Sequence, residues 1–329
     1  MHLRLVLLPS TTVSEPIIRG EVAVDGLDVD VITTVDGREI RTFADLDAAA
    51  DLGDVHSAGS STVIQYTAMG QREPRRFIPV FHARGPKSRN LLVRDDGSVS
   101  TPEDLRGRKV GVSNYTNTAS IWIRGMLQDE YGVKASEIIW VEGERDFINA
   151  PTRSIRREQV GVESGVDRNR LVGMLQRGEI DGLCWTGGGG YYSFYPGGPI
   201  DRFCRQQGGI RSLIDDPQVI LDYYRRSVMD HITETLAIRE STLEREPEAP
   251  RLVLELFRRA AEAVRSRMSA EERDLQGKEA ELLGRDPFDY RLGTAEMNSI
   301  RTLSRYNHEQ EIAPRAPSLE ELVPASLLA

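Results

Sequence analysis

Short apolar runs alternate with helical patterns along almost the whole chain, and this alternation restricts the fold more than any other feature. The runs are rich in β-branched residues and bounded by turn residues, which predicts strands. We expect these strands at Leu3–Leu8, Leu27–Ile32, Phe77–Phe81, Asn90–Arg94, Lys109–Val112, Ile138–Val141, Gly182–Cys184 and Thr235–Ile238. Apolar residues at helical spacing predict helices at Thr118–Tyr131, Arg170–Gln176 and Glu248–Met268. The alternation predicts an α/β fold with mainly parallel sheets.

The length and two polar stretches predict two lobes. A chain of 329 residues suggests two domains. The stretches Asp95–Ser98 and Tyr195–Pro199 have the composition of hinges and bracket about 100 residues. We therefore expect a first lobe at 1–94, an inserted second lobe at 95–198, and a return to the first lobe at 199–329, where the chain is rich in helix and charge.

Charge and cysteine content exclude several classes of protein. The net charge of −9, from 51 acidic and 42 basic residues, argues against nucleic-acid and membrane partners, which attract cations. Cys184 and Cys204 are the only cysteines, so the sequence predicts neither a disulfide framework nor a thiolate metal cluster. The run Leu3–Leu8 is too short for a signal peptide, and no stretch reaches the roughly 18 apolar residues of a spanning helix. We expect a cytoplasmic protein.

Loops that follow strands are the expected ligand sites, because open α/β sheets bind ligands at the carboxyl ends of their strands. In the segment Asp54–Thr62, Ser57 and Ser60 precede a helical pattern. Their hydroxyl groups suit either an ordinary helix cap or a site where free amides bind an anion.

A second loop has the stronger anion-binding pattern. Val110–Thr118 runs from a strand through Tyr115 and Asn117 into the helix that begins at Thr118. It lacks the Lys of a P-loop and the Gly-x-Gly-x-x-Gly of a dinucleotide site, so small carboxylates suit it better than nucleotides. A plain capped helix is the alternative.

A third loop, Cys184–Tyr192, contains four consecutive glycines and aromatic residues that could cover a ring, Trp185 among them. The alternative is a mobile glycine loop. Cys184 itself has no His near it in the sequence, and we interpret it as a small core residue.

The histidines are scattered, and no pair has the spacing of a zinc site. His56, His82 and His231 lie near predicted strand ends, which favours them as functional candidates. Arg84 follows a strand and is the strongest candidate to pair with a carboxylate, because a guanidinium can bind one through two hydrogen bonds. A solvated surface Arg is the alternative.

Several motifs resemble those of a known family. The stretch Thr101–Val112 resembles the entry to the second lobe in type II periplasmic-binding-protein folds. More specific motifs resemble the 4,5-dihydroxyphthalate decarboxylase family, from about residue 50 to the C-terminus. They are Tyr115–Val133 followed by Ile139 and Trp140, then Gly178–Leu183, Asp286–Tyr290 and Thr302–Gln310.

This resemblance implies both a fold and an activity. The fold would be two α/β lobes joined by a two-strand hinge, with the ligand in the cleft between the lobes. The activity would be loss of CO₂ from a dihydroxylated aromatic diacid without an organic cofactor. Such a reaction needs cations or helix N-termini that hold carboxylates, a proton donor for the ring carbon, and exclusion of water.

Two expected site positions depart from the family pattern. One directly precedes the strand Thr235–Ile238, and the other lies in the first loop. The family's Pro-Ile-Met-His segment aligns without gaps so that its His falls on Glu234, with His231 three residues upstream. The family's acidic residue in the first loop is Ser57 here, beside His56.

A third departure lies after Phe77–Phe81. The family's Arg-x-Phe-Arg-His segment is Arg84–Ser88 in this chain, so Arg84 and the basic Lys87 are kept while the His becomes Ser88. We therefore expect the fold and the anion-binding helix to be kept, with a substrate, or even a reaction, that differs from 4,5-dihydroxyphthalate decarboxylation.

The main hypothesis is a cofactor-independent decarboxylase that acts on a small aromatic or cyclic carboxylic acid. The amides of Asn117 and Thr118 and the Thr118 side chain would hold one carboxylate, and Arg84 would pair with a second. The other expected substrate-binding residues are Lys87, Ser57, Ser60, Tyr115 and Trp185. Proton transfer would fall to Glu234, His231 or His56.

Two alternatives stay open. A solute-binding protein of the same fold would bind a small anion without turnover. Another lyase, such as the chorismate-dehydrating enzymes that share only the fold, would release water instead of CO₂. We expect no organic cofactor and no resident metal, although the sequence leaves a divalent metal open. The charged C-terminal helices favour a homodimer.

Overall fold

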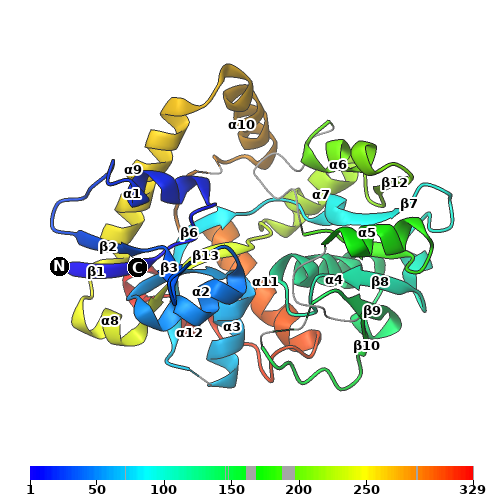
Figure 1. Ribbon diagram of the computed structural model, residues 1–329, viewed down its shortest axis with the longest axis horizontal. Helices are drawn as coiled ribbons and strands as arrows, with labels where there is room; N and C mark the ends of the chain where they lie inside the picture. Colours follow the sequence, from blue (N-terminus) through cyan, green and yellow to red (C-terminus); the bar gives the residue numbers. More distant parts are fainter. Residues whose placement is uncertain are drawn as a thin grey trace. The chain divides into compact units, whose positions relative to one another are not determined.

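The structure is a computed structural model, and it describes residues 1–70, 72–144, 146, 148–160, 168–186, 197–286 and 288–328. The chain forms two compact units (Figure 1). Unit 1 contains residues 1–84, 232–301 and 317–329, and unit 2 contains residues 85–231 and 302–316. Each unit has its own central sheet, so we describe them separately.

Unit 1 is built on a five-stranded sheet with the order β2-β1-β5-β13-β6. The strands are β1 (His2–Val6), β2 (Asp28–Ile32), β5 (Val55–Gly59), β6 (Arg75–Ala83) and β13 (Glu234–Arg239). Strands β1, β2 and β5 are parallel, whereas β13 lies antiparallel between β5 and β6. The start of β13 therefore lies at the sheet edge where β5 and β6 end.

Helices cover the strands of unit 1. Figure 1 shows α1 and α9 above the strands and α2, α3 and α12 below them. Their bounds are α1 (Glu15–Ile18), α2 (Phe43–Ala49), α3 (Ser60–Met69), α9 (Ala249–Arg267) and α12 (Leu319–Leu322). The remaining elements are β3 (Thr34–Val35), β4 (Arg38–Glu39), α8 (Glu240–Arg245), α10 (Ala270–Leu283) and α13 (Ala325–Leu328).

Unit 2 is built on a six-stranded sheet with the order β10-β9-β8-β11-β7-β12. The strands are β7 (Leu91–Arg94), β8 (Lys109–Val112), β9 (Ile139–Glu142), β10 (Arg156–Gln159), β11 (Gly182–Cys184) and β12 (Ile210–Ser212). Strand β7 runs antiparallel to both of its neighbours, and β8, β9, β10 and β11 are parallel.

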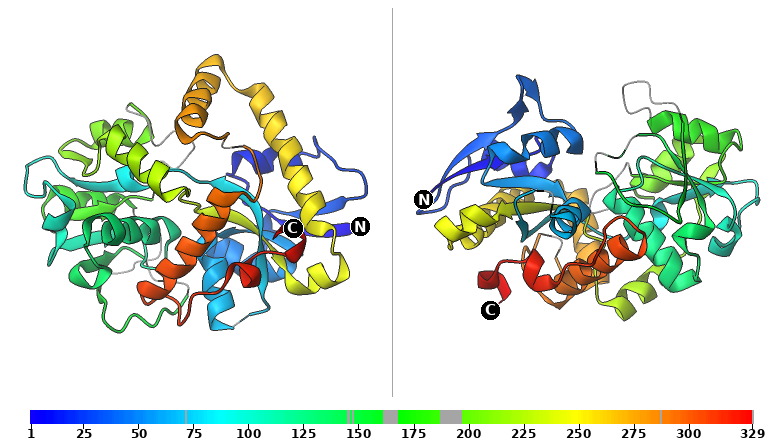
Figure 2. Two further views of the ribbon diagram at one scale, coloured as in Figure 1. Left: turned by 180° about the vertical axis from the view of Figure 1, so that it is seen from behind. Right: turned by 90° about the horizontal axis from the view of Figure 1, so that it is seen from below.

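Helices α4 and α5 pack on this sheet, α4 on β11 and α5 on β7, β8 and β11 (Figure 2). The helices are α4 (Thr118–Tyr131), α5 (Arg168–Gln176), α6 (Pro199–Gln207), α7 (Pro217–Ser227) and α11 (Thr294–Glu309), of which α11 has residues in both units.

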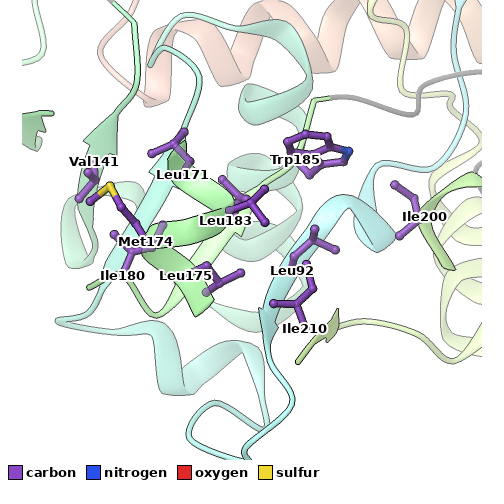
Figure 3. Close-up of a cluster of buried hydrophobic side chains, with 11 residues drawn as sticks. Leu92, Val141, Leu171, Met174, Leu175, Ile180, Leu183, Trp185, Ile200 and Ile210 are labelled. Carbon is purple, nitrogen blue, oxygen red and sulfur yellow. The ribbon is translucent and has the colours of Figure 1, made fainter. Parts of the chain in front are cut away.

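The core of unit 2 lies between α5 and the sheet. Figure 3 shows Leu171 and Leu175 of α5 beside Leu183 of β11 and Leu92 of β7, and all of them are buried. Cys184 is also buried, and burial raises the pKa of its thiol to about 12. It is therefore a neutral core residue, as its sequence context predicts.

The α/β architecture is confirmed, but the sheets are mixed rather than mainly parallel, because β13 and β7 each run antiparallel to both of their neighbours. The strands β3, β4, β5, β10 and β12 were not expected, and β5 is the most important of them for the site. Val55–Gly59 was expected within a loop and forms the central strand β5. The polar residues His56 and Ser57 and the terminal Gly59 conceal its strand pattern. All five residues are buried because β5 lies between β1 and β13.

The unit boundaries also differ from the expected lobe boundaries at 94/95 and 198/199. The chain passes between units after Arg84 and after His231, and residues 302–316 belong to unit 2. Strands β7 and β12 cause the difference, because both pair within the six-stranded sheet. The polar stretch Asp95–Ser98 is thus a turn inside unit 2. Residues 195 and 196 of the other expected hinge lie outside the described residues.

No helix among the described residues is long and apolar enough to cross a membrane.

A close helix contact in unit 2 gives a first prediction. A Cβ atom on Gly125 of α4 would come within 2.1 Å of the Tyr306 ring of α11. We expect Gly125→Ala to lower the free energy of unfolding by about 1–3 kcal/mol, because the packed ring must move. Gly277→Ala in α10 is the matched control, since its Cβ would meet nothing within 4 Å, and should raise stability by about 0.5–1 kcal/mol. Urea denaturation measures both, and equal effects would contradict the contact.

Candidate functional site

The loop between β8 and α4 in unit 2 is held by carboxylates of the protein itself. The Tyr115 amide donates to Glu142 Oε2 at 3.2 Å, and the Thr116 amide and hydroxyl donate to Asp146 Oδ1, both at 2.9 Å. Arg157 of β10 donates to both oxygens of Glu142, at 2.6 and 2.7 Å, and also binds Asp146. These anion-binding amides are therefore already occupied.

The N-terminus of α4 is capped in the same way. The Asn117 side chain accepts from the amides of Ala119 and Ser120, at 3.0 and 3.3 Å, and the Asn117 amide donates to the Asn114 carbonyl at 3.4 Å. The Asn117 amide thus has an internal acceptor in this arrangement, and its expected contact with a substrate carboxylate stays a prediction. Thr118, the first residue of α4, is buried.

Tyr115 belongs to the interior of unit 2 and does not line an open site. Its ring is fully buried, its hydroxyl donates to the Gln310 carbonyl at 3.3 Å, and the Arg124 guanidinium lies 3.9 Å from its ring centroid. Burial raises the pKa of its hydroxyl to about 12. These contacts give Tyr115 a structural role in unit 2, and its expected contact with a substrate stays a prediction.

A small pocket lies where β8, β9 and β11 end. Ser113, Gly143, Glu144, Leu171, Leu183, Cys184, Trp185 and Thr186 line it. The Ser113 hydroxyl and the Trp185 indole N–H are buried and have no hydrogen-bond partner among the described residues. The Trp185 ring stacks on Phe203, with centroids 4.2 Å apart. In Figure 3 the indole nitrogen points away from Leu183. Residues 187–192 of the expected glycine loop lie outside the described residues.

His231 is held inside unit 2 through both of its ring nitrogens. Nδ1 accepts from the Lys87 amide at 3.1 Å, and Nε2 lies 3.1 Å from the Tyr223 hydroxyl. Burial lowers the pKa of His231 to about 3. Both ring nitrogens therefore contact protein groups, and a role of His231 in proton transfer stays a prediction. Lys87 itself is only 3% exposed.

In unit 1, Glu234 and Ser60 lie where β5 ends, and Ser57 is the middle residue of β5, paired with Leu236. Glu234 pairs with Gly59 of β5 and Ala83 of β6, and the register shifts beside it. The Ser60 amide donates to the Thr233 carbonyl at 2.9 Å, which ties the start of α3 to the same edge. The hydroxyls of Ser57 and Ser60 are buried without a hydrogen-bond partner among the described residues.

Arg84 follows β6 in unit 1 and is paired with an internal carboxylate. Its Nη1 lies 3.4 Å from Glu296 Oε1, and its Nη2 donates to the Asp286 carbonyl at 2.7 Å. Glu296 also lies 3.7 Å from Arg285. Arg84 thus pairs with a carboxylate, as its chemistry predicts, but one that the protein supplies.

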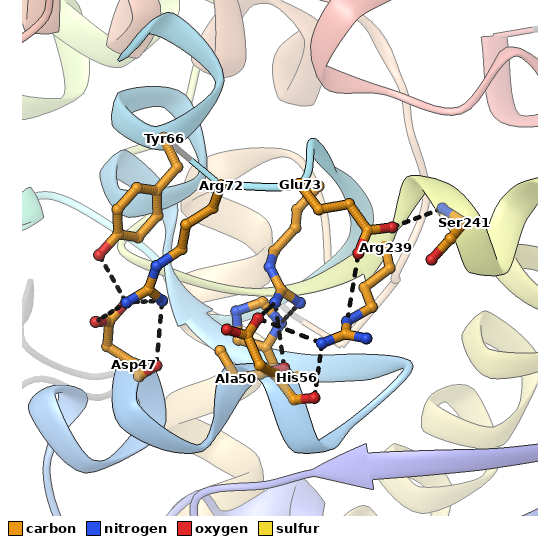
Figure 4. A network of polar contacts seen from close by, with 10 residues as sticks. Asp47, Ala50, His56, Tyr66, Arg72, Glu73, Arg239 and Ser241 are labelled. Atoms are coloured by element: carbon orange, nitrogen blue, oxygen red, sulfur yellow. Dashed lines mark hydrogen bonds and ion pairs between the residues drawn. The ribbon is translucent and has the colours of Figure 1, made fainter. Parts of the chain in front are cut away.

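His56 lies near the opposite end of β5, within a polar network that Figure 4 shows together with Tyr66, Asp47 and Arg239. Its Nδ1 is 3.2 Å from Arg75 Nη1, and Arg75 also binds Asp51 at 2.6 Å. Burial and the Arg75 charge hold the pKa of His56 well below its ordinary value. His56 is therefore neutral inside unit 1, and a role in proton transfer stays a prediction.

His82 lies near the end of β6, whereas His56 lies near the start of β5. The sequence marks His82 only as a histidine near a strand end. It lies in β6 next to Ala83, against the Phe257 ring at 5.4 Å between centroids. Neither ring nitrogen has a hydrogen-bond partner among the described residues. Burial lowers its pKa to about 3. Among the described residues, no three His, Cys, Asp or Glu side chains gather as a metal site.

Comparisons with known proteins show a similarity in sequence over nearly the full length of the chain. The chain is 30% identical over 333 residues to the 4,5-dihydroxyphthalate decarboxylase of Comamonas testosteroni. The alignment covers 95% of this chain and 93% of that protein. Residues 82–186 also match the family model described as NMT1/THI5 like.

Solved structures show the fold. The periplasmic aliphatic sulphonate binding protein SsuA of Escherichia coli matches with a TM-score of 0.57 at 14% identity. The match covers 99% of this chain and 98% of that protein. The periplasmic sulfonate-binding protein SsuA of Methylobacillus flagellatus has a TM-score of 0.61 at 10% identity, over 100% and 92% of the two chains. The chain therefore has a periplasmic-binding-protein-like fold.

The unpaired imidazole of His82 gives a second prediction. Its pKa is about 3 in the folded protein against an ordinary 6.5, so between these values only the unfolded chain binds the proton. Folding stability should therefore fall as the pH drops below about 6.5, by up to about 1.4 kcal/mol per pH unit for this group. In His82→Leu, the slope of the free energy of unfolding against pH should be shallower by up to about 1.4 kcal/mol per pH unit, which corresponds to the uptake of one proton fewer on unfolding.

Urea denaturation between about pH 6.5 and about pH 4 measures this slope. The control is His2→Gln, because His2 is exposed and its hydrogen bond with Asp28 raises its pKa, so its loss should not flatten the slope. An unchanged slope in His82→Leu would show that His82 is protonated in the folded protein.

Proposed function

Because the chain belongs to the family of the 4,5-dihydroxyphthalate decarboxylases, we propose that it is a carboxy-lyase that removes CO₂ from a small aromatic carboxylic acid. The observation that carries this proposal is the similarity over 95% of the chain, which spans both units. The reaction replaces the carboxylate by hydrogen: the ring–carboxylate bond breaks, CO₂ leaves, and a proton binds the ring carbon. We propose that it proceeds without an organic cofactor.

Lys87 is the proposed partner of a substrate carboxylate in unit 2. It is a buried cation, and it follows the point where the chain enters the unit. A buried ammonium attracts a carboxylate more strongly than an exposed one, because water screens the pair less. Thr118, at the positive end of the α4 dipole, and Trp185, as an aromatic wall, are the proposed further contacts.

Glu234 is the proposed proton donor, with Ser57 and Ser60 as hydrogen-bond donors to the substrate. Glu234 and Ser60 lie where β5 ends, and Ser57 lies in β5 two residues before that end. Glu234 is half-buried, and a substrate carboxylate beside it would favour its protonated form through like-charge repulsion. The contacts of His231 and His56 support this choice, since their nitrogens are engaged within the protein.

A second candidate is a protein that binds a small anion without turnover. It is favoured by the fold that the chain shares with the sulphonate-binding SsuA proteins over nearly its whole length. Turnover separates the two candidates.

The direct test incubates the purified protein with 4,5-dihydroxyphthalate, phthalate and a set of hydroxybenzoates. CO₂ release and the mass of the product are measured. Release of CO₂ with a product that has lost one carboxyl group supports the decarboxylase. Binding without any turnover across the set would establish the anion-binding protein instead, and loss of water would establish another lyase.

Glu234 gives a third prediction. Glu234→Gln keeps the shape and removes the acid, so we expect kcat to fall by about 10²–10⁴, the usual contribution of a positioned proton donor. The matched control is Glu244→Gln, an exposed glutamate of α8 in the same unit, which should leave kcat unchanged. Steady-state kinetics measure both variants. A Glu234→Gln enzyme with the wild-type kcat would exclude Glu234 as the proton donor.

A further inference from the structure

The small pocket where β8, β9 and β11 end in unit 2 has a polar residue to which the proposed function gives no role. Ser113 lines this pocket and is only 9% exposed, and its hydroxyl has no hydrogen-bond partner among the described residues. Burial of a hydroxyl group without a partner is unfavourable, and a ligand that fills the pocket would supply that partner.

The chain holds Ser113 in one position. The pairing of β8 with β9 continues past both strands, because the Glu144 amide donates to the Ser113 carbonyl at 2.7 Å. Two residues after Ser113, the Tyr115 amide donates to Glu142 at 3.2 Å. The backbone is therefore fixed on both sides of Ser113, so a ligand would not have to order this loop when it binds.

The wall that Trp185 forms is fixed as well. Its amide donates to the Asn90 carbonyl at 2.8 Å, and the Asn90 side-chain amide donates to the Trp185 carbonyl at 2.8 Å. The Trp185 ring stacks on Phe203, with centroids 4.2 Å apart. Leu171 and Leu183 add apolar surface to the lining (Figure 3). A small pocket with such walls suits the edge of one aromatic ring.

The charges of the lining indicate which edge of a substrate the pocket binds. Glu144 is the only charged residue among the described residues that line it, and burial raises the pKa of the Cys184 thiol to about 12, so this thiol is neutral. The lining thus offers no cation to a carboxylate. A ring hydroxyl group is uncharged, and the Ser113 hydroxyl can donate to it or accept from it. The pocket therefore suits the hydroxyl-bearing edge of an aromatic acid rather than its carboxylate.

We propose that this pocket binds a hydroxyl-bearing edge of the substrate ring and that Ser113 is a specificity-determining residue, whose side chain forms a hydrogen bond with a ring hydroxyl. The proposal rests on the proposed function for the substrate class, an aromatic carboxylic acid. It narrows that class to acids with a hydroxyl group on the ring, and it assigns the carboxylate to contacts outside this pocket.

The test measures the Kd of 3,4-dihydroxybenzoate and of benzoate for the full chain by isothermal titration calorimetry. Wild type should bind 3,4-dihydroxybenzoate about threefold to tenfold more tightly than benzoate, because one hydrogen bond is gained. In Ser113→Ala this preference should fall to about one, with the Kd of benzoate unchanged. Without ligand, Ser113→Ala should unfold at a higher urea concentration than wild type, since it removes a buried hydroxyl that has no partner.

Ser120→Ala is the matched control. Ser120 is a fully buried residue of α4 in the same unit, its hydroxyl also has no partner among the described residues, and it does not belong to the pocket lining. Its substitution should raise the urea midpoint in the same way and leave the preference between the two acids at the wild-type value.

Several outcomes would overturn the proposal. They are equal binding of the two acids by wild type, no binding of either acid, a preference that Ser113→Ala keeps, and a preference that Ser120→Ala loses to the same extent. A lower urea midpoint in Ser113→Ala would also overturn it, because the hydroxyl would then have a partner within the protein.

Measured release of CO₂ separates this proposal from the proposed function. If wild type releases no CO₂ but shows the preference, and Ser113→Ala loses it, only the decarboxylation is overturned. If CO₂ is released and Ser113→Ala keeps the wild-type preference, only the role of Ser113 is overturned.

Discussion

The pairing of Arg157 with Glu142 and Asp146 determines the conformation at the sheet edge of unit 2. One guanidinium from β10 binds two carboxylates that follow β9, and these carboxylates bind the amides of Tyr115 and Thr116 ahead of α4. The carboxylates of Glu142 and Asp146 thus occupy two amides that could otherwise bind the anion of a ligand. Helix α4 starts from this fixed turn, and it carries both Trp122, which stacks on His231, and Asp129, which accepts a hydrogen bond from the Tyr306 hydroxyl.

Burial separates the histidines from the groups that can act on a substrate. His56, His82 and His231 are neutral inside their units, because each would lose its hydration on protonation. Two of the three also have their nitrogens engaged by neighbours. We propose Lys87, in unit 2, as the partner of a substrate carboxylate and Glu234, in unit 1, as the proton donor.

The fold alone does not decide between an enzyme and a binding protein. The SsuA proteins share the architecture at 10–14% identity, whereas a decarboxylase shares 30% identity over nearly the full length. A common arrangement of strand ends supplies amides and polar side chains to either kind of protein. We expect the difference to lie in a few side chains at those strand ends, and we propose that the departures at Ser57, Ser88 and Glu234 bear on the substrate rather than on the fold.

The sequence by itself determined the α/β alternation, the bounds of β8, β11 and α4, and the family, because periodicity and local motifs are written in neighbouring residues. It also marked Arg84, Lys87 and Glu234. Only the tertiary structure decided which of these groups the protein uses for itself. Glu296, 212 residues from Arg84, pairs with its guanidinium, and Tyr223 and Lys87 occupy the nitrogens of His231. Such partners come from distant segments, so no local pattern reveals that a candidate residue is already engaged.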